Sequence, residues 1–124
     1  MNCAFAKTIY TGKKVVSNAY LLFNGNKITA ISKSKKGRQI GKFNVLTPAF
    51  IDPHSHIGLI RSGEPSSEAE GNEQLNAILA LSDALDSFQS DDSALKDAVE
   101  MGVLYSCILP GSGNIIGGMS AIIR

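Results

Sequence analysis

The strongest constraint on the fold is a pair of segments in which consecutive residues, rather than alternate ones, are apolar. The first segment begins at Phe43 and continues across Thr47 and Pro48 to Ile51, and the second covers residues 103–109. Consecutive apolar residues are typical of strands that are buried on both faces of a parallel sheet. With a helix predicted between them, the two segments follow the strand-helix-strand order of a parallel sheet or barrel.

The residues between these segments favour two helices. Asp91 or Asp92 can cap a helix over about residues 93–101, and Gly102 suits the left-handed position just past its end. Apolar residues also recur at helical spacing over residues 73–88, although polar residues interrupt the pattern. We therefore expect one short, well-capped helix and a longer helix before it.

The first part of the chain carries strand signals. Segments rich in β-branched and aromatic residues at 5–10, 15–23 and 27–32 predict three short strands. The dipeptide Asn24-Gly25 predicts a tight hairpin with a type I′ turn between the last two, because these residue types adopt the positive φ angles that such a turn needs.

Composition argues against several classes of protein. The 124 residues are 44% hydrophobic and 19% charged, which is ordinary for a globular domain. A net charge of +1 argues against nucleic acid or an anionic membrane as a partner. One local basic run lacks aromatic residues that could stack on a base, so a solvated turn is favoured over a binding patch. Its members are Lys33, Lys35, Lys36, Arg38 and Lys42.

The chain also lacks the signals of membrane insertion and export. No apolar stretch reaches the ~20 residues that a transmembrane helix needs, so we expect a soluble protein. The N-terminus has neither a charged leader with a long apolar core nor a cleavage site, which favours a cytoplasmic location. In that reducing compartment Cys3 and Cys107 are expected to be free thiols, and Cys107 a core residue.

Two histidines, His54 and His56, are the strongest candidates for chemistry. Alternate side chains of a strand share a face, so the two imidazoles point the same way from Cα atoms about 6.6 Å apart, at a rise of roughly 3.3 Å per residue. They can therefore bind one metal ion, at the strand end where parallel folds and barrels place active sites. Asp52 lies on the same face and could accept a proton from an imidazole, orient the nearby backbone or bind the metal.

Blander interpretations remain for these and other residues. An isolated His-x-His pair is more often a strand end without a ligand, although the neighbouring Pro, Asp and Gly residues favour a metal site here. Four glutamates over residues 64–73 are more typical of a solvated loop than of a ligand set. The glycine-rich segment 110–118 lacks the spacing of a phosphate-binding loop and favours a tight turn.

The segment Pro48–Gly58, which reads Pro-Ala-Phe-Ile-Asp-Pro-His-Ser-His-Ile-Gly, resembles the first-strand signature of the amidohydrolase superfamily, close to its imidazolonepropionase-like members. The strand-rich first part resembles the small β-sandwich of that family. Residues 97–103 resemble its usual helix and second strand, and the loop from Pro110 to Gly118 is similar to one in the imidazolonepropionase-like branch. The resemblance therefore covers nearly the whole chain.

The resemblance implies an α/β fold with a β-rich N-terminal part. Residues 1–46 would form a β-sandwich segment, and residues 47–124 the first βα units of an incomplete TIM-type barrel. It also implies that His54 and His56 bind a divalent metal, most often zinc, and that Asp52 supports them. In the family the metal activates water to attack a C–N bond, commonly of a cyclic amide or ureide. The remaining ligands of the family come from later strands, and none is assigned here.

Two hypotheses follow. In the first, the chain is the N-terminal fragment of a metal-dependent amidohydrolase. It would be inactive alone, because a closed barrel takes ~250 residues. A small-molecule substrate would bind only if other strands complete the site. In the second, it is a non-enzymatic metal-binding or self-associating module that keeps the same fold. Both predict exposed sheet edges, and hence a homo-oligomer or another association through those edges.

Overall fold

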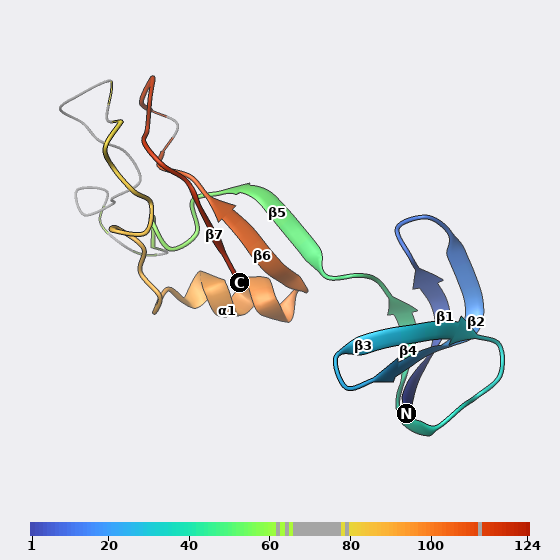
Figure 1. Cartoon of the computed structure of the whole chain (residues 1–124). Helices are drawn as coiled ribbons and strands as arrows, with labels where there is room; N and C mark the ends of the chain where they lie inside the picture. The colour runs from blue at the N-terminus through green and yellow to red at the C-terminus, as the bar shows by residue number, and fades with distance from the viewer. Residues whose placement is uncertain (62, 64, 66–77, 79, 112) are drawn as a thin grey trace. The chain divides into compact units, whose positions relative to one another are not determined.

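The computed structural model describes residues 1–61, 63, 65, 78, 80–111 and 113–124. Contacts divide the chain into two compact units, Met1–Pro48 and Ala49–Arg124. The described structure is mostly β-sheet with little helix, arranged as two mixed sheets (Figure 1). In this part of the chain, no helix is long and apolar enough to cross a membrane.

The first unit is a four-stranded sheet with the strand order β3-β2-β1-β4. Its strands are β1 (Asn2–Tyr10), β2 (Val15–Asn24), β3 (Lys27–Ser32) and β4 (Arg38–Leu46). β2 pairs antiparallel with both β1 and β3, whereas β4 pairs parallel with β1. The three strands predicted before residue 33 are therefore confirmed, and β4 completes the sheet.

The core of this unit centres on β1 and β2. Ala6, Ile9 and Ala19 are buried there, and partly buried side chains of Val16, Leu21, Ile31 and Leu46 pack against them. Other apolar residues stay exposed, among them Ile28 at 70% and Val45 at 53%. A single sheet is present, so a second layer that would make a sandwich is not seen in this unit.

The hairpin between β2 and β3 forms where the sequence predicts it, but with a different turn. Asn24 pairs with Lys27, so the two-residue loop is Gly25-Asn26. Gly25 has φ 55°, whereas Asn26 does not have a positive φ. A type I′ turn needs positive φ at both central residues, while glycine at the first position alone is the pattern of type II′.

The basic run is only partly a turn. Lys33, Lys35 and Lys36 precede β4, whereas Arg38 and Lys42 lie within it. The prediction of a solvated turn is thus wrong for the second half of the run. Parallel pairing with β1 recruits these residues into the sheet, where Arg38 lies opposite Asn2 and Lys42 opposite Phe5.

The second unit is a three-stranded sheet with one helix. The strands are β5 (Phe50–Ser55), β6 (Val103–Ile108) and β7 (Ala121–Ile123), in the order β5-β6-β7, and α1 (Ser93–Glu100) lies between β5 and β6 in the sequence. β5 and β6 are parallel, and β6 and β7 are antiparallel. The predicted order of strand, helix and parallel strand is present, and β7 is an element that the sequence did not reveal.

The short helix is confirmed. Asp92 is its N-cap, and the Asp92 carboxylate accepts a hydrogen bond from the N–H of Ala94. Gly102 follows the helix with φ 88°, a left-handed conformation that glycine adopts without strain. The core of this unit consists of Leu59, Ala84 and Ile108.

The prediction of a longer helix over residues 73–88 is wrong for the described part of this range, because residues 80–88 form turns. The backbone there pairs with a distant segment: Met119 N–H donates to Ser82 O at 2.8 Å, and Ala84 N–H donates to Met119 O at 3.0 Å. The Ser82 hydroxyl also donates to Gly117 O. These long-range hydrogen bonds replace the local ones that a helix would use, while residues 73–77 and 79 lie outside the described residues.

The prediction that the strand carrying Phe50 and Ile51, now β5, is buried on both faces is also wrong. Phe50 is 53% exposed and Ile51 is 69% exposed. β5 lies at the edge of its sheet, and among the described elements it contacts β6 alone. Pro53 fits this position, since a residue without an N–H is tolerated at a sheet edge.

Candidate metal centre

His54 and His56 lie at the C-terminal end of β5, where the strand gives way to a turn. His54 is the fifth residue of β5, and His56 follows its last residue, Ser55. The centroids of the two rings are 5.4 Å apart and their planes are nearly perpendicular, at 87°. The two imidazoles therefore lie beside each other, with their rings in edge contact.

The ring of His56 is held by the strand next to it. Its Nδ1 lies 2.7 Å from the carbonyl oxygen of Leu109, the residue that follows β6. A carbonyl oxygen only accepts hydrogen bonds, so Nδ1 carries the proton and the lone pair of a neutral imidazole is on Nε2. Leu109 is itself fixed, because its N–H donates to Ser55 O at 2.9 Å.

Asp52 acts on the backbone of the same segment. Its Oδ1 accepts a hydrogen bond of 3.1 Å from the N–H of His54. Of the roles considered for Asp52 from the sequence, this contact corresponds to orientation of the backbone. It fixes the peptide group from which the His54 side chain projects.

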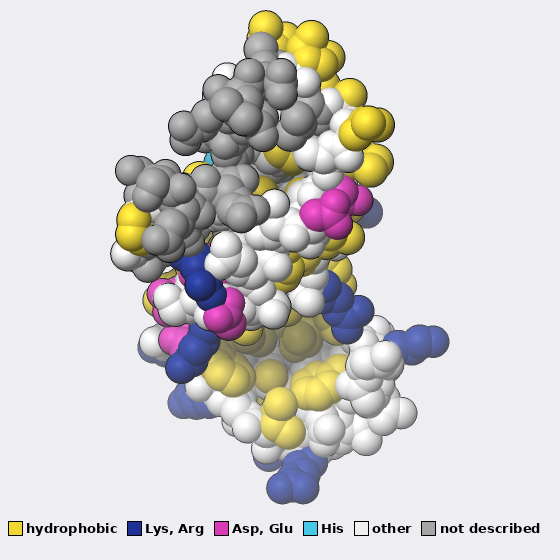
Figure 2. All heavy atoms as spheres, turned by 90° about the vertical axis from the view of Figure 1, so that its left-hand side faces the viewer, with side chains coloured by type: hydrophobic (Ala, Val, Ile, Leu, Met, Phe, Trp, Pro, Cys, Tyr) yellow, Lys and Arg dark blue, Asp and Glu magenta, His cyan; other side chains and the backbone are white. Residues whose placement is uncertain are grey.

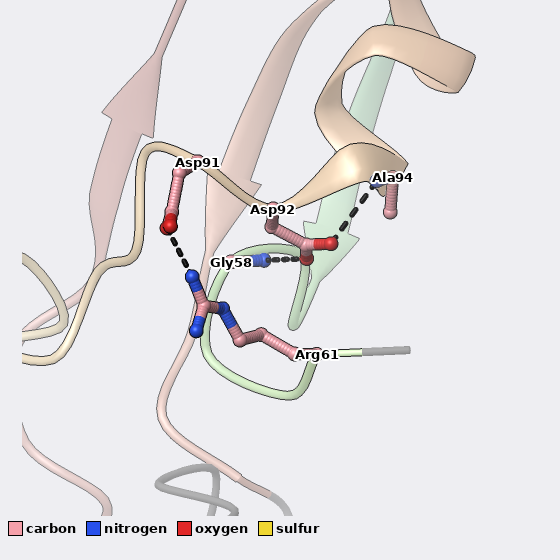
Figure 3. Close-up of polar contacts among 5 residues, drawn as sticks. All are labelled: Gly58, Arg61, Asp91, Asp92 and Ala94. Carbon is pink, nitrogen blue, oxygen red and sulfur yellow. Dashed lines mark hydrogen bonds and ion pairs between the residues drawn. The ribbon is translucent and has the colours of Figure 1, made fainter. Parts of the chain in front are cut away.

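The turn after His56 is tied to the start of α1. The carbonyl oxygen of His56 accepts hydrogen bonds from the N–H groups of Leu59 and Ile60. Gly58, in the middle of the turn, donates its N–H to Asp92 Oδ2 at 3.1 Å (Figure 3). The sequence predicts a helix cap at Asp91 or Asp92, but no local signal reveals the contact of Asp92 with a residue 34 positions earlier.

A charged pair lies on the outside of this junction. The Arg61 guanidinium forms an ion pair with the exposed carboxylate of Asp91, beside the Asp92 contact (Figure 3). The hydrogen bond from Arg61 and its positive charge lower the pKa of Asp91 below its ordinary value of 3.8. Asp91 therefore stays ionised at neutral pH and is directed towards Arg61.

The donors suit a borderline metal ion, and the described residues bring two of them together. Imidazole nitrogen is a common zinc ligand, and with Zn–N bonds of about 2.1 Å two ring centroids that share an ion lie within roughly 6.5 Å. The 5.4 Å separation of His54 and His56 satisfies that limit. Among the described residues no three His, Cys, Asp or Glu side chains gather into a metal-binding group.

The two cysteines take no part in this arrangement. Cys3 and Cys107 are free thiols, as predicted, and Cys3 is buried in the first unit while Cys107 is partly buried in β6. The four glutamates at residues 64, 68, 70 and 73 lie outside the described residues.

Comparisons with known proteins give one structural relative. No protein-family model matches the chain, and no curated protein matches it. Among solved structures, the chain is similar to a crystal structure of an amidohydrolase from Thermotoga maritima MSB8, with a TM-score of 0.80 and 27% sequence identity. The similarity covers 100% of this chain and 33% of the other, so the chain spans about a third of the length of that amidohydrolase.

Proposed function

We propose that this chain is the N-terminal part of a metal-dependent amidohydrolase, in which His54 and His56 are two of the metal ligands. The observation that carries the proposal is the hydrogen bond between His56 Nδ1 and Leu109 O. A ligating histidine commonly donates its other ring N–H to a carbonyl or carboxylate, which fixes the ring and directs its free nitrogen to the metal. The similarity to a solved amidohydrolase over the whole chain supports the same interpretation.

The ion that fits this donor set is a divalent metal, with zinc as the first choice. When bound, such an ion lowers the pKa of a coordinated water towards ~7 and polarises a carbonyl oxygen. The substrates implied are cyclic amides or related compounds with a C–N bond to hydrolyse. In this chain, the Leu109 carbonyl holds the His56 ring and Asp52 holds the backbone of His54.

The fold that accompanies this proposal is a β-sandwich segment followed by the first βα units of a TIM-type barrel, with the change between them near residues 46–48. Parallel pairing of β5 and β6, with α1 between them in sequence, is what a barrel would contain at this point. The exposed sides of Phe50 and Ile51 supply apolar surface for further strands or helices of the barrel. A full barrel takes ~250 residues, so this proposal has further strands complete the barrel around the metal.

A second candidate is a non-enzymatic module that binds metal weakly or associates with itself. It is favoured by the two-histidine donor set of the described residues and by apolar side chains that remain exposed. Figure 2 shows such side chains on one face, and the exposed residues come from both units. In the second unit, those at least half exposed include Phe50, Ile51, Ile78, Leu81, Leu85, Val99, Met101, Ile115, Met119 and Ile122.

Metal binding by the 124-residue chain tests the proposal directly. We expect one equivalent of Zn²⁺ or Co²⁺ to bind weakly by calorimetry and by Co²⁺ absorption, since a catalytic zinc normally has three protein ligands. His54→Ala and His56→Ala should each weaken binding by at least about tenfold. Glu100→Gln, which removes an exposed carboxylate of α1, is the matched control and should bind as the wild type does. Binding that neither histidine variant changes would contradict the assignment.

Hydrolysis assays test whether the 124-residue chain is active alone or needs further strands. The metal-loaded chain alone should show no substantial hydrolysis of cyclic amides, because two histidines hold the ion weakly and leave the site open. Robust turnover that disappears in His54→Ala would overturn the expectation that other strands complete the site. The two candidate functions differ in the next step: hydrolysis that appears on adding the missing two-thirds of an amidohydrolase barrel supports the enzyme, and its persistent absence supports the module.

A further inference from the structure

The Asp92 carboxylate bonds to two segments that are far apart in the sequence. Its Oδ1 accepts from Ala94 N–H at 3.0 Å and its Oδ2 accepts from Gly58 N–H at 3.1 Å (Figure 3). A helix N-cap needs only the first of these bonds and works well at an exposed position. Asp92 is 6% exposed, and burial of a carboxylate is unfavourable unless hydrogen bonds satisfy it. The contact with Gly58 is therefore a feature additional to the cap.

Gly58 lies two residues after His56, within the turn that His56 begins. The Gly58 N–H donates to Asp92, and its carbonyl oxygen accepts from Gln89 N–H at 2.9 Å. The His56 carbonyl oxygen accepts from Leu59 N–H at 2.9 Å, which closes the same turn. The backbone on either side of Gly58 is thus held both by His56 and by the residues just before α1.

The shape of the site leaves the turn little room to move. Gly58 has φ 80°, and a Cβ atom at this position would lie 2.4 Å from the ring of Phe88. Leu59 is buried against Ala84 and Ile108. The turn is consequently closely packed, with Gly58 against the Phe88 ring and Leu59 within the core of the unit.

We propose that Asp92 is a positioning residue for His56. Through Gly58 it fixes the turn that follows His56, and Leu109 fixes the His56 ring, so the direction of Nε2 is set from two sides. The identity of the ligand rests on the proposed function above, whereas the contact between Asp92 and Gly58 does not. The site would accordingly extend from the C-terminal end of β5 to the N-terminus of α1.

Two variants separate positioning from helix capping. Asp92→Asn and Asp92→Ser both keep an oxygen that can cap α1, because Asn and Ser rank with Asp as N-caps. Neither satisfies both N–H groups: the Asn amide nitrogen would face one of the two donors, and the Ser hydroxyl is too short to reach Gly58 as well as Ala94. Asp91→Asn is the matched control, since it changes the adjacent carboxylate and leaves Gly58 untouched.

We expect three results in the full chain. In Asp92→Asn and Asp92→Ser, the Gly58 amide should exchange with solvent about tenfold faster or more, as expected for a lost local hydrogen bond. Affinity for Zn²⁺ should fall by about tenfold, the lower end of the range for lost partners of metal ligands. The neutral His56 ring, observed by ¹⁵N NMR without metal, should lose its preference for a proton on Nδ1. Asp91→Asn should match the wild type in all three.

Each outcome decides one of the two claims. Wild-type exchange at Gly58 and an unchanged His56 tautomer in both Asp92 variants would overturn the positioning role, even if unfolding shows a loss of stability. Suppose that the wild type binds no Zn²⁺ or Co²⁺, while the Asp92 variants still change the Gly58 exchange rate and the His56 tautomer. That result would retain the positioning role and reject the proposed metal site. Changes of the same size in Asp91→Asn would also overturn the positioning role, because they would show a general effect of charge.

Discussion

The carbonyl oxygen of Leu109 lies 2.7 Å from Nδ1 of His56, although the two residues are 53 positions apart in the sequence. Each follows directly on a strand of a parallel pair, His56 after β5 and Leu109 after β6. Parallel pairing brings the carboxyl ends of neighbouring strands to one edge of a sheet, so the contact is a consequence of topology. The backbone carbonyl of Leu109, just after β6, therefore determines which ring nitrogen of His56 carries no proton.

The first prediction concerns the protonation of the His56 ring. In its neutral form, the His56 imidazole should carry its proton on Nδ1, because the Leu109 carbonyl accepts that hydrogen bond. Long-range ¹H–¹⁵N correlation spectra distinguish the two tautomers, and His54→Ala assigns the signals by removing the other histidine. A spectrum in which His56 carries its proton mainly on Nε2 would contradict both this geometry and the metal assignment that depends on it.

The second prediction concerns Gly58. Gly58→Ala should destabilise the protein by about 1–3 kcal/mol from the clash, in addition to about 1 kcal/mol for a positive φ. The new Cβ would meet the Phe88 ring at 2.4–2.6 Å. Gly63 has a similar φ of 83° and nothing within 4 Å of its Cβ position, so Gly63→Ala shows the backbone cost alone. Urea unfolding measures both variants, and equal losses would mean that the Phe88 ring moves aside freely.

The third prediction concerns pH. Since the folded pKa of Asp91 is lowered by Arg61, its contribution to stability is complete above the unfolded value near 3.8 and is lost as pH falls through the folded pKa. Asp91 is fully exposed, so the effect on unfolding should be small and weaker in high salt. NMR titration of the Asp91 carboxyl should show its pKa rising towards the ordinary value in Arg61→Gln. A pKa for Asp91 that Arg61→Gln leaves unchanged would show that the ion pair does not form in solution.

Local sequence patterns predicted the elements that are stabilised by residues close together in the sequence. A cap at Asp91 or Asp92 and the glycine at position 102 predicted both ends of α1, and the structure has Asp92 as the cap. The dipeptide at residues 24–25 located the hairpin between β2 and β3. The turn type was wrong because the register placed Gly25, and not Asn24, at the first central position. A one-residue shift of this kind is decided by pairing along the whole hairpin.

Long-range pairing accounts for what the sequence could not reveal. Residues 80–88 have helical spacing, yet Ser82 and Ala84 bond to Met119 in place of their own neighbours. In the site, strand alternation predicted that the His54 and His56 side chains point the same way, and their ring centroids lie 5.4 Å apart although β5 ends at Ser55. The contacts of His56 with Leu109 and of Gly58 with Asp92 depend on how separate segments fold together, which no local spacing encodes.

The last prediction concerns association through β5. Ile51 is 69% exposed on an edge strand, and such edges pair readily with another chain, so the wild type should form dimers or larger species in light scattering. Ile51→Lys places a charge on that strand and should shift the population towards monomer, because burial of an unpaired ammonium is unfavourable. Ile28→Lys is the matched control: Ile28 is 70% exposed on β3, an edge strand of the first unit. Association that survives Ile51→Lys but not Ile28→Lys would locate the interface on the first sheet, and a monomeric wild type would reject self-association altogether.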